Sequence, residues 1–314
     1  MKELDHERFF EPFIDEVDGV ACVPASYADA DIARITSPLG WRFPLILDEE
    51  TSLSAQVASC FSAPSSSRFG PYCDNIVGMN WELPDRRRVR VGERVVKSTT
   101  GYDILRFLLA TDGRFGRATE YVLRLRPACD GGGIVFFDGP QGSLESAATE
   151  LMHSCYIHWL ESMDWLTTGP QDGRLRIGIH CPQDEWPIFL MHLDGIAKGR
   201  GLLTTVTEGN GQVFDGLPDL VLKTTPDRVI SLARDMAQYP GVRSIALCAP
   251  AMVHVYLPSG AEAAAVVKKM VWPLADGLHS LGGGWKSRHV ECPLFGTDEA
   301  SWVKSLAKEW GVAA

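Results

Sequence analysis

The chain has 314 residues, 45% of them hydrophobic, and a formal net charge of −10 from 30 basic and 40 acidic residues. This length and composition allow a large buried core and about two domains. The negative charge would repel a polyanion, which excludes nucleic acid as a partner class. No run reaches the roughly 18 to 20 apolar residues needed to cross a bilayer, so we expect no transmembrane segment.

The eight cysteines are scattered along the chain and form no Cys-x-x-Cys pair. This spacing argues against a zinc site or an iron–sulfur cluster, and we predict no metal site. The charged start of the chain, MKELDHERFF, lacks the apolar segment of a secretion signal. These features predict a cytoplasmic protein with free thiols.

In the first part of the chain, apolar spacing predicts a helix over residues 1–20, a strand at 19–23 and a short helix at 30–35. Residues 75–91 predict a hairpin that turns at Pro84-Asp85, with the arginines at 86–88 in the solvated turn. A loop at 99–103 leads into an apolar helix at 104–109. A further strand is expected at 119–125, ending before Pro127.

A glycine-rich stretch at 129–133 marks a boundary, after which strand and helix patterns alternate. In the first round we expect strands at 134–137, 174–180 and 202–207, and helices at 144–160 and 184–197. In the second round we expect strands at 220–223, 244–248, 253–257 and 285–292, and helices beginning at Thr225-Pro226, at the Ser259/Glu262 capping box and at Thr297. Two such rounds predict two ferredoxin-like halves and an α+β fold class.

Motifs between residues 40 and 127 resemble, in order and spacing, those of the FAD-linked oxidases. Residues 40–45 resemble the Gly-x-x-Phe-Pro motif, and residues 51–75 match the flavin-contacting stretch without gaps. Residues 96–104, Val-Lys-Ser-Thr-Thr-Gly-Tyr-Asp-Ile, are similar to a motif of the FAD-binding subunit of glycolate oxidase. Residues 113–127 resemble the closing Gly-Thr-Leu-Gly … Thr-Glu … Leu-Arg-x-x-Pro pattern.

This resemblance implies a reduced, PCMH-type FAD-binding subdomain in residues 1–127 and a ferredoxin-like cap domain in residues 128–314. It also implies FAD as the cofactor. The family's contact positions fall on Ser54, Ala55, Ser59, Gly70, Asp74, Thr100, Gly101, Tyr102, Gly113, Gly116, Arg117 and Ala118.

The chain departs from the family at several of these positions. The family holds the FAD pyrophosphate with a glycine-rich loop of an N-terminal subdomain; no such loop precedes Gly40, and we expect that subdomain to be missing. The family's Gly-Gly falls on Ser54-Ala55, where each Cβ takes up space that glycine leaves to the cofactor. Arg117 stands where the family has an aliphatic residue, and we expect it to point to solvent because burial without a partner is costly. We therefore expect FAD binding to be weakened or lost.

The sequence predicts no catalytic residue. The histidine-rich metal motif of the hydroxy-acid dehydrogenases has no counterpart, and His153 and His158, five residues apart, would lie on different faces of a helix. Structural or surface roles are therefore favoured for the histidines. Tyr102 and Asp103 match the family motif, and both a flavin-supporting role and a purely structural turn remain open.

Three functions follow from these observations. The first is an accessory subunit, with FAD binding weakened or lost, that joins partner subunits of a glycolate-oxidase-like complex oxidising a 2-hydroxy acid, or that self-associates. The second is a working FAD-dependent oxidoreductase acting on glycolate, lactate or a similar acid. The third is a non-catalytic module that binds a small molecule.

Overall fold

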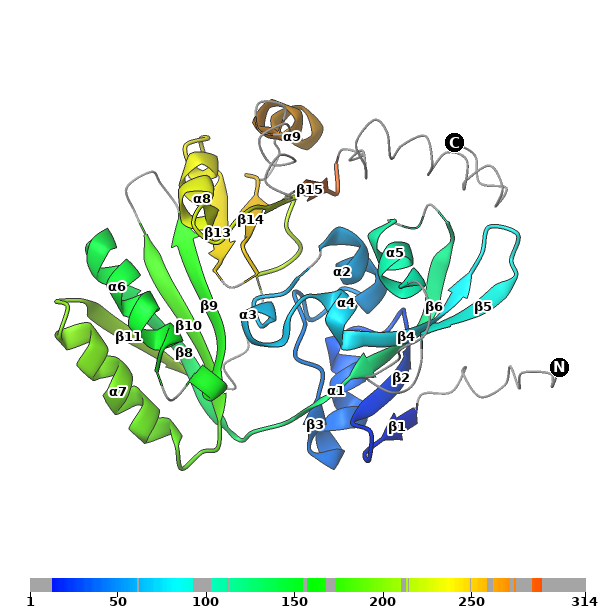
Figure 1. Cartoon of the computed structure of the whole chain (residues 1–314), viewed down its shortest axis with the longest axis horizontal. Coiled ribbons are helices and arrows are strands. Elements are labelled where there is room, and N and C mark those ends of the chain that lie inside the picture. Colours follow the sequence, from blue (N-terminus) through cyan, green and yellow to red (C-terminus); the bar gives the residue numbers. More distant parts are fainter. Residues whose placement is uncertain are drawn as a thin grey trace. The chain divides into compact units, whose positions relative to one another are not determined.

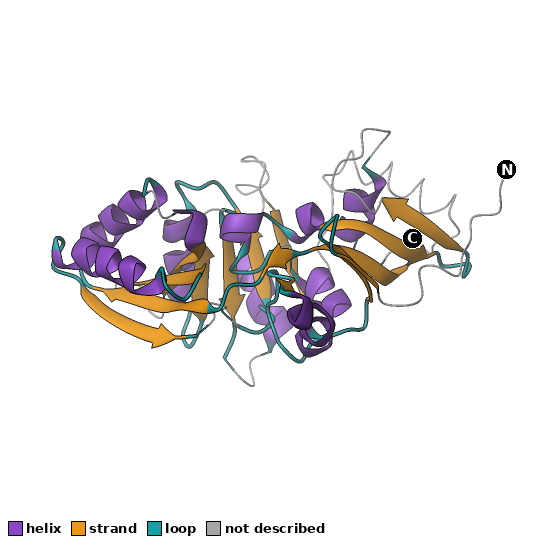
Figure 2. Cartoon of the chain, turned by 90° about the horizontal axis from the view of Figure 1, so that it is seen from below, coloured by secondary structure: helices purple, strands orange, loops and turns teal. Residues whose placement is uncertain are grey.

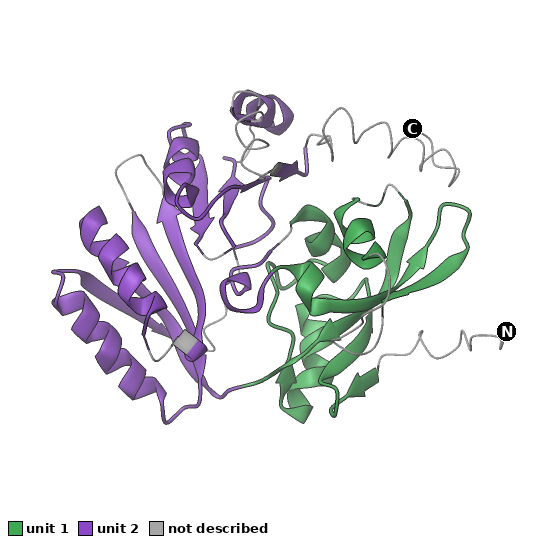
Figure 3. Cartoon of the chain, in the orientation of Figure 1, with its two compact units in different colours: residues 1–61, 71–128, 293–314 green, residues 62–70, 129–292 purple. Residues whose placement is uncertain are grey.

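The chain divides into two compact units (Figure 3). Unit 1 comprises residues 1–61, 71–128 and 293–314, and unit 2 comprises residues 62–70 and 129–292. The structure is a computed structural model, and it describes residues 13–60, 62–92, 103–111, 113, 115–154, 157–167, 173–209, 213, 215–248, 250–258, 262–271, 274 and 284–289.

Unit 1 is built on a five-stranded antiparallel sheet in the order β1-β2-β6-β4-β5 (Figure 1). Its strands are β1 (Phe13–Asp15), β2 (Val20–Pro24), β4 (Ile76–Glu82), β5 (Arg88–Gly92) and β6 (Arg117–Arg124). Its helices are α1 (Asp29–Thr36), η2 (Ser37–Leu39), α2 (Leu53–Ser59), α4 (Tyr72–Asn75) and α5 (Ile104–Ala110), and β3 (Trp41–Arg42) pairs with β7 (Arg126–Pro127). The predicted hairpin at 75–91 is confirmed as β4 and β5, and its turn places Arg86 at φ 67°.

The predicted helix at 1–20 is wrong for its described part. Residues 13–24 form a hairpin in which Phe13 lies opposite Cys22. The Asp15 carboxylate accepts hydrogen bonds from the N–H groups of Val17 and Asp18, which closes a turn of the kind that Asp favours. Residues 1–12 lie outside the described part of the chain.

Unit 2 is built on one eight-stranded antiparallel sheet in the order β11-β8-β10-β9-β13-β14-β12-β15. Its strands are β8 (Gly131–Asp138), β9 (Leu160–Thr167), β10 (Arg174–Cys181), β11 (Leu203–Glu208), β12 (Leu220–Lys223), β13 (Arg243–Leu247), β14 (Met252–Tyr256) and β15 (Gly284–Ser287). Its helices are α3 (Ser66–Phe69), α6 (Gln141–Met152), η3 (Ile157–Trp159), α7 (Trp186–Lys198), α8 (Val229–Ala237) and α9 (Ala263–Val271).

This topology confirms the two predicted ferredoxin-like halves. The first half runs β8-α6-β9-β10-α7-β11 and the second β12-α8-β13-β14-α9-β15, and β9 pairs with β13 to join them into one sheet. The expected helix at 144–160 is wrong in its second part, because α6 ends at Met152 and Leu160 begins β9. The predicted Ser259 cap and the helix from Thr297 lie outside the described residues.

All four long helices of unit 2 cover the same face of the sheet (Figure 2). Alternate residues of each central strand point into this single core, such as Met163 and Trp165 of β9 and Leu175 and Ile177 of β10. The residues between them point to the opposite face, and several of these are polar or charged although they are buried. The second face of the sheet therefore carries the unusual chemistry of unit 2.

Candidate functional site

In unit 1, α5 links the segments that carry the predicted cofactor positions. It contacts α2, which holds Ser54, Ala55 and Ser59, and α4, which holds Asp74. Its Phe107 ring also lies 5.5 Å from the ring of Phe115, next to Gly116. The structure thus gathers three of the predicted segments around one short helix.

The backbone N–H groups at the start of α2 already have partners within the chain. Leu53 N donates to the Tyr27 carbonyl at 2.8 Å, and Ser54 N donates to the Ala25 carbonyl at 2.9 Å. Ala55 N donates to the Ser52 hydroxyl, the N-cap of the helix, at 3.4 Å. A bound anion at a helix start needs such donors, and here they are occupied.

A buried glutamine fixes the loop in front of α2. The Gln56 side chain is fully buried; its amide nitrogen donates to the carbonyls of Asp48 and Thr51, each at 2.8 Å, and its oxygen accepts from Leu47 N at 2.7 Å. Each of these Gln56 hydrogen bonds holds the loop against the helix. They stabilise the arrangement in which the amides at the start of α2 are hydrogen-bonded within the chain. Ser59, the last residue of α2, is half-buried.

Asp74 is engaged by a neighbouring side chain. Arg106 of α5 contacts Asp74 at 2.5 Å and also approaches Asp103 at 3.1 Å. The Asp103 carboxylate caps α5 by accepting from Arg106 N at 3.0 Å. Asp103 is therefore the N-cap of α5. Tyr102 lies outside the described residues, so both interpretations of this segment stay open.

The positions at the start of β6 serve the packing of β6 on β4. Gly116 has φ +122°, and a Cβ there would lie 2.1 Å from the Glu82 carbonyl oxygen. Gly113, at φ +79°, closes the preceding turn by accepting from Gly116 N at 3.2 Å. Arg117 points to solvent, as predicted, and its exposed guanidinium pairs with Glu82 at 2.9 Å, while Ala118 lies opposite Trp81 on β4.

The remaining predicted positions lie elsewhere. Gly70 ends α3 with φ 80° and belongs to unit 2. Thr100, Gly101 and Tyr102 lie outside the described residues. The predicted cofactor positions that the structure describes in unit 1 are therefore Ser54, Ala55, Ser59, Asp74, Gly113, Gly116, Arg117 and Ala118.

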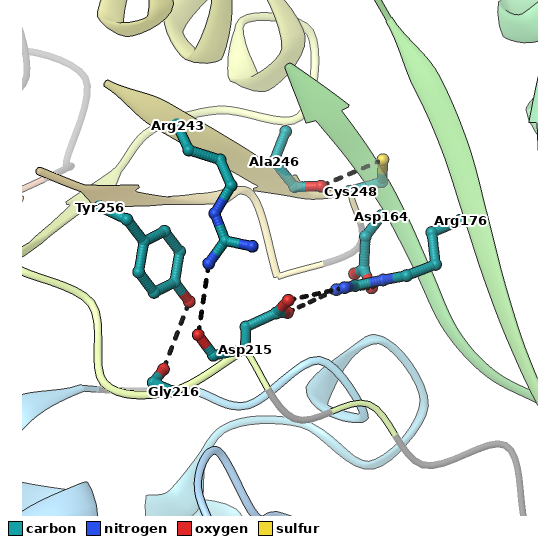
Figure 4. Close-up of polar contacts among 8 residues, drawn as sticks. All are labelled: Asp164, Arg176, Asp215, Gly216, Arg243, Ala246, Cys248 and Tyr256. Carbon is teal, nitrogen blue, oxygen red and sulfur yellow. Dashed lines mark hydrogen bonds and ion pairs between the residues drawn. The ribbon is translucent and has the colours of Figure 1, made fainter. Parts of the chain in front are cut away.

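Unit 2 contains a buried charged cluster that sequence reasoning missed (Figure 4). Arg176 of β10 and Asp164 of β9 are register partners, so both side chains stand on the face opposite the helices. The Arg176 guanidinium donates to Asp164 at 2.8 and 3.1 Å. It also donates to both carboxylate oxygens of Asp215, at 2.7 and 2.6 Å, in a two-pronged contact.

Asp215 lies in the segment between β11 and β12, and this segment is held to the sheet by further contacts (Figure 4). Arg243 donates to the Asp215 carbonyl at 3.4 Å and stacks over the Tyr256 ring at 4.3 Å. The Tyr256 hydroxyl in turn donates to the Gly216 carbonyl at 3.4 Å. The cluster therefore fastens a connecting segment to the second face of the sheet.

Burial shifts the proton affinities of this cluster in opposite directions. Burial raises the pKa of the Asp164 carboxyl to about 6, although Arg176 opposes the shift. Burial lowers the pKa of His254, on the neighbouring part of the same face, to about 4. His180 accepts from the Cys129 N–H at 2.8 Å, in keeping with the structural role expected for the histidines.

One signal in the sequence could have revealed the cluster. Asp164 and Arg176 are each flanked by apolar residues, Met163 and Trp165 in the first case and Leu175 and Ile177 in the second, and a charged residue in a buried strand needs a partner. Asp215 has no comparable signal, because it lies in an irregular segment far along the chain.

The described residues lack two other kinds of feature, a metal-binding group and a membrane-spanning helix. No group of three or more His, Cys, Asp or Glu side chains there is placed to hold a metal ion. No helix in the described part is long and apolar enough to cross a membrane.

No family model matches the chain. Over 118 residues it is 26% identical to an uncharacterised FAD-linked oxidoreductase of Mycobacterium tuberculosis, covering 37% of this chain and 26% of that protein. Over 87 residues it is 32% identical to the mitochondrial D-lactate dehydrogenase (cytochrome) of Arabidopsis thaliana, covering 28% and 15%. A Saccharomyces cerevisiae D-lactate dehydrogenase is 23% identical over 165 residues, covering 51% and 28%. The matches thus span between 15% and 28% of these relatives.

Solved structures match far more of the chain. An alkyldihydroxyacetonephosphate synthase superposes with a TM-score of 0.60 over 96% of this chain and 64% of that one, at 11% identity. A VAO-type flavoprotein from Myceliophthora thermophila C1 gives a TM-score of 0.62 over 92% and 64%, at 12% identity. The chain has the fold of the VAO-type flavoproteins.

Within this VAO-type fold, the predicted cofactor positions at the start of α2 have their backbone N–H groups hydrogen-bonded within the chain. The amides at the start of α2 are taken up by Tyr27, Ala25 and Ser52. The Gly-Gly of the pattern is replaced by Ser54-Ala55, and Gly116 faces the backbone of β4. The chain therefore has this fold, and three backbone N–H groups at the start of α2 have acceptors within the chain.

Proposed function

We propose that this chain is an accessory subunit of an FAD-linked oxidoreductase that oxidises a 2-hydroxy acid such as glycolate or lactate, and that it holds FAD weakly or not at all by itself. The observation that carries the proposal is the start of α2, where three successive backbone N–H groups donate to acceptors of the chain. FAD would have to break these hydrogen bonds, and each one exchanged without gain costs about 0.5–1.5 kcal/mol.

The substrate class rests on the sequence relatives. Two of them are D-lactate dehydrogenases, and a third is described as an FAD-linked oxidoreductase. The chain spans 64% of the length of each of the two solved structures described above. In the proposed complex, partner subunits supply the flavin contacts that unit 1 does not provide.

An activity assay tests this function. The purified chain, with and without added FAD, is mixed with D-lactate or glycolate and a dye that accepts electrons. The proposal predicts no dye reduction above the protein-free control, because a flavin that is not held in place cannot accept the hydride productively. Acid-dependent dye reduction by the chain alone would contradict it.

The similarity to the Arabidopsis thaliana D-lactate dehydrogenase, at 32% identity over 87 residues, favours a second candidate, a working FAD-dependent oxidoreductase. The second candidate requires stoichiometric flavin on the purified chain. It therefore predicts that the chain alone reduces the dye when D-lactate or glycolate is added. The same assay therefore separates them.

A further inference from the structure

The strands at the ends of the two sheets are protected in different ways, with one exception. β1 has three residues and β15 has four, so each offers little edge. β5 carries Arg88 and Arg90 beside exposed Val89. Short strands and charged side chains are the usual means by which sheet edges avoid pairing with other chains.

β11 is the exception. It has six residues, Leu-Thr-Thr-Val-Thr-Glu, with no charge before Glu208 and no proline. Leu203 is 73% exposed and Val206 is 40% exposed. Among the described strands, β8 is the one partner of β11, so its outer edge is available. Its β-branched residues favour an extended strand in that position.

The register shows which backbone groups point outward. Gly209 N donates to the Gly132 carbonyl at 3.3 Å, and a Cβ on Gly133 would lie 2.6 Å from the Thr207 carbonyl oxygen. Thr207 and Thr205 therefore turn their backbone groups toward β8. By alternation, Thr204, Val206 and Glu208 present their N–H and C=O groups at the outer edge.

We propose that β11 pairs with β11 of a second copy of this chain, antiparallel about a two-fold axis at Val206. A two-fold axis makes an antiparallel edge complementary to itself, because Val206 exchanges N–H···O=C hydrogen bonds with Val206 of the other copy and Thr204 exchanges them with Glu208. Thr204 then lies opposite Glu208 of the second copy, so no like charges face each other.

The side chains fit this arrangement as well. Val206 lies opposite Val135 on β8, so it stands on the face of the sheet that forms the core. In the pair, the two Val206 side chains become direct cross-strand neighbours, which buries an apolar group that a single copy leaves exposed. The pairing involves unit 2 alone, and it does not depend on whether unit 1 holds a flavin.

Size-exclusion chromatography with light scattering, on the full chain from about 1 to about 100 μM, tests the proposal. We expect a dimer that dissociates on dilution. Val206→Lys should weaken it by at least about tenfold, because it places two like charges side by side. Val89→Lys is the matched control, because Val89 is 38% exposed on β5, an edge strand of the other sheet that already carries arginines. This variant should leave the dimer unchanged. A monomer throughout the range, or a dimer that withstands Val206→Lys, would overturn the proposal.

Cross-linking tests the register. The Cα atoms of a hydrogen-bonded antiparallel pair lie about 5.5 Å apart, a separation that a disulfide can bridge. Under mild oxidation, Val206→Cys should therefore give several times more covalent dimer than the wild-type chain with its own cysteines. No increase over wild type would rule out a two-fold axis at Val206.

Discussion

At the scale of single residues, Arg176 joins two carboxylates that come from different parts of unit 2. Its guanidinium contacts Asp164 and Asp215, and all three side chains are almost fully buried. A buried pair of this kind is weak support for stability in itself, but removing one partner leaves an uncompensated charge. Arg176 therefore matters because two acids depend on it.

Arg176→Met should lower the free energy of unfolding by about 3–5 kcal/mol. The control is Arg174→Met, two residues earlier on the same strand, where the partly exposed ion pair with Asp138 should contribute no more than about 1 kcal/mol. Urea unfolding of both variants measures the difference. Equal losses would show that the cluster does not hold the segment around Asp215.

The same cluster predicts how stability changes with pH. The folded chain keeps the Asp164 proton up to a pKa of about 6, above the ordinary 3.8, so it binds more protons than the unfolded chain between these values. Asp164 alone therefore makes stability fall as pH rises through this window. His254, whose pKa falls from 6.5 to about 4, binds fewer protons when folded and makes stability rise over a similar window.

Single variants should separate these opposing contributions. In Asp164→Asn, the free energy of unfolding should rise more steeply than in wild type from about pH 4.5 to pH 6.5. In His254→Gln, the free energy of unfolding should stay constant or fall over the same range. Relative to wild type, each variant should change the free energy of unfolding by roughly 2–3 kcal/mol from one end of this pH window to the other. Chemical denaturation at several pH values gives the slopes, and slopes of the same sign in both variants would contradict the account.

At the scale of elements, Gly116 fixes the approach of β6 to β4. Gly116→Ala would place a methyl group 2.1 Å from the Glu82 carbonyl, at a positive φ that disfavours side chains. We expect a loss of at least about 2 kcal/mol. Gly195→Ala, in α7 with nothing within 4 Å of the added Cβ, should instead stabilise by about 0.5–1 kcal/mol. Thermal unfolding compares the two, and a tolerated Gly116→Ala would refute this packing role.

The start of α2 allows a second test at this scale. Restoring glycines with Ser54→Gly and Ala55→Gly removes two Cβ atoms but leaves the Tyr27 and Ala25 carbonyls that accept the helix amides. The double variant should therefore hold FAD no better than wild type. A gain of about tenfold or more in FAD affinity would show that side-chain bulk, and not the occupied amides, limits binding.

The sequence predicted elements well where periodicity and turn chemistry agreed. The β4–β5 hairpin, α7 and the two ferredoxin-like rounds follow from such patterns. β9 was missed because both of its faces are buried. Its sequence therefore lacks the alternation of apolar and polar residues that marks a half-exposed strand. The second strand of the hairpin at 13–24 was predicted at 19–23 and is confirmed as β2, whereas its first strand, β1, was missed because the apolar spacing of residues 1–20 also suits a helix.

The candidate site was less accessible to sequence reasoning. The resemblance placed the cofactor positions on segments that α5 does link in unit 1. That their amides are already bonded depends on the carbonyls of Ala25 and Tyr27, whose positions no motif encodes. The Arg176 cluster depends on the pairing of β9 with β10 and on one residue of an irregular segment.

At the scale of the whole molecule, the chain has a VAO-type fold, and the backbone N–H groups of the predicted flavin positions at the start of α2 have acceptors within the chain. Fold and cofactor affinity are separable, because the fold depends on buried apolar faces and the affinity on a few polar groups. The proposed accessory function is one consequence of this separation.

An equilibrium titration of the desalted chain with FAD, followed by flavin fluorescence and absorbance, tests the central claim most directly. The account predicts a colourless purified protein and a dissociation constant no tighter than about 10 μM, since the helix amides would have to give up their present acceptors. A yellow protein that retains one FAD per chain through desalting would contradict it, and would identify the chain as a flavoenzyme in its own right.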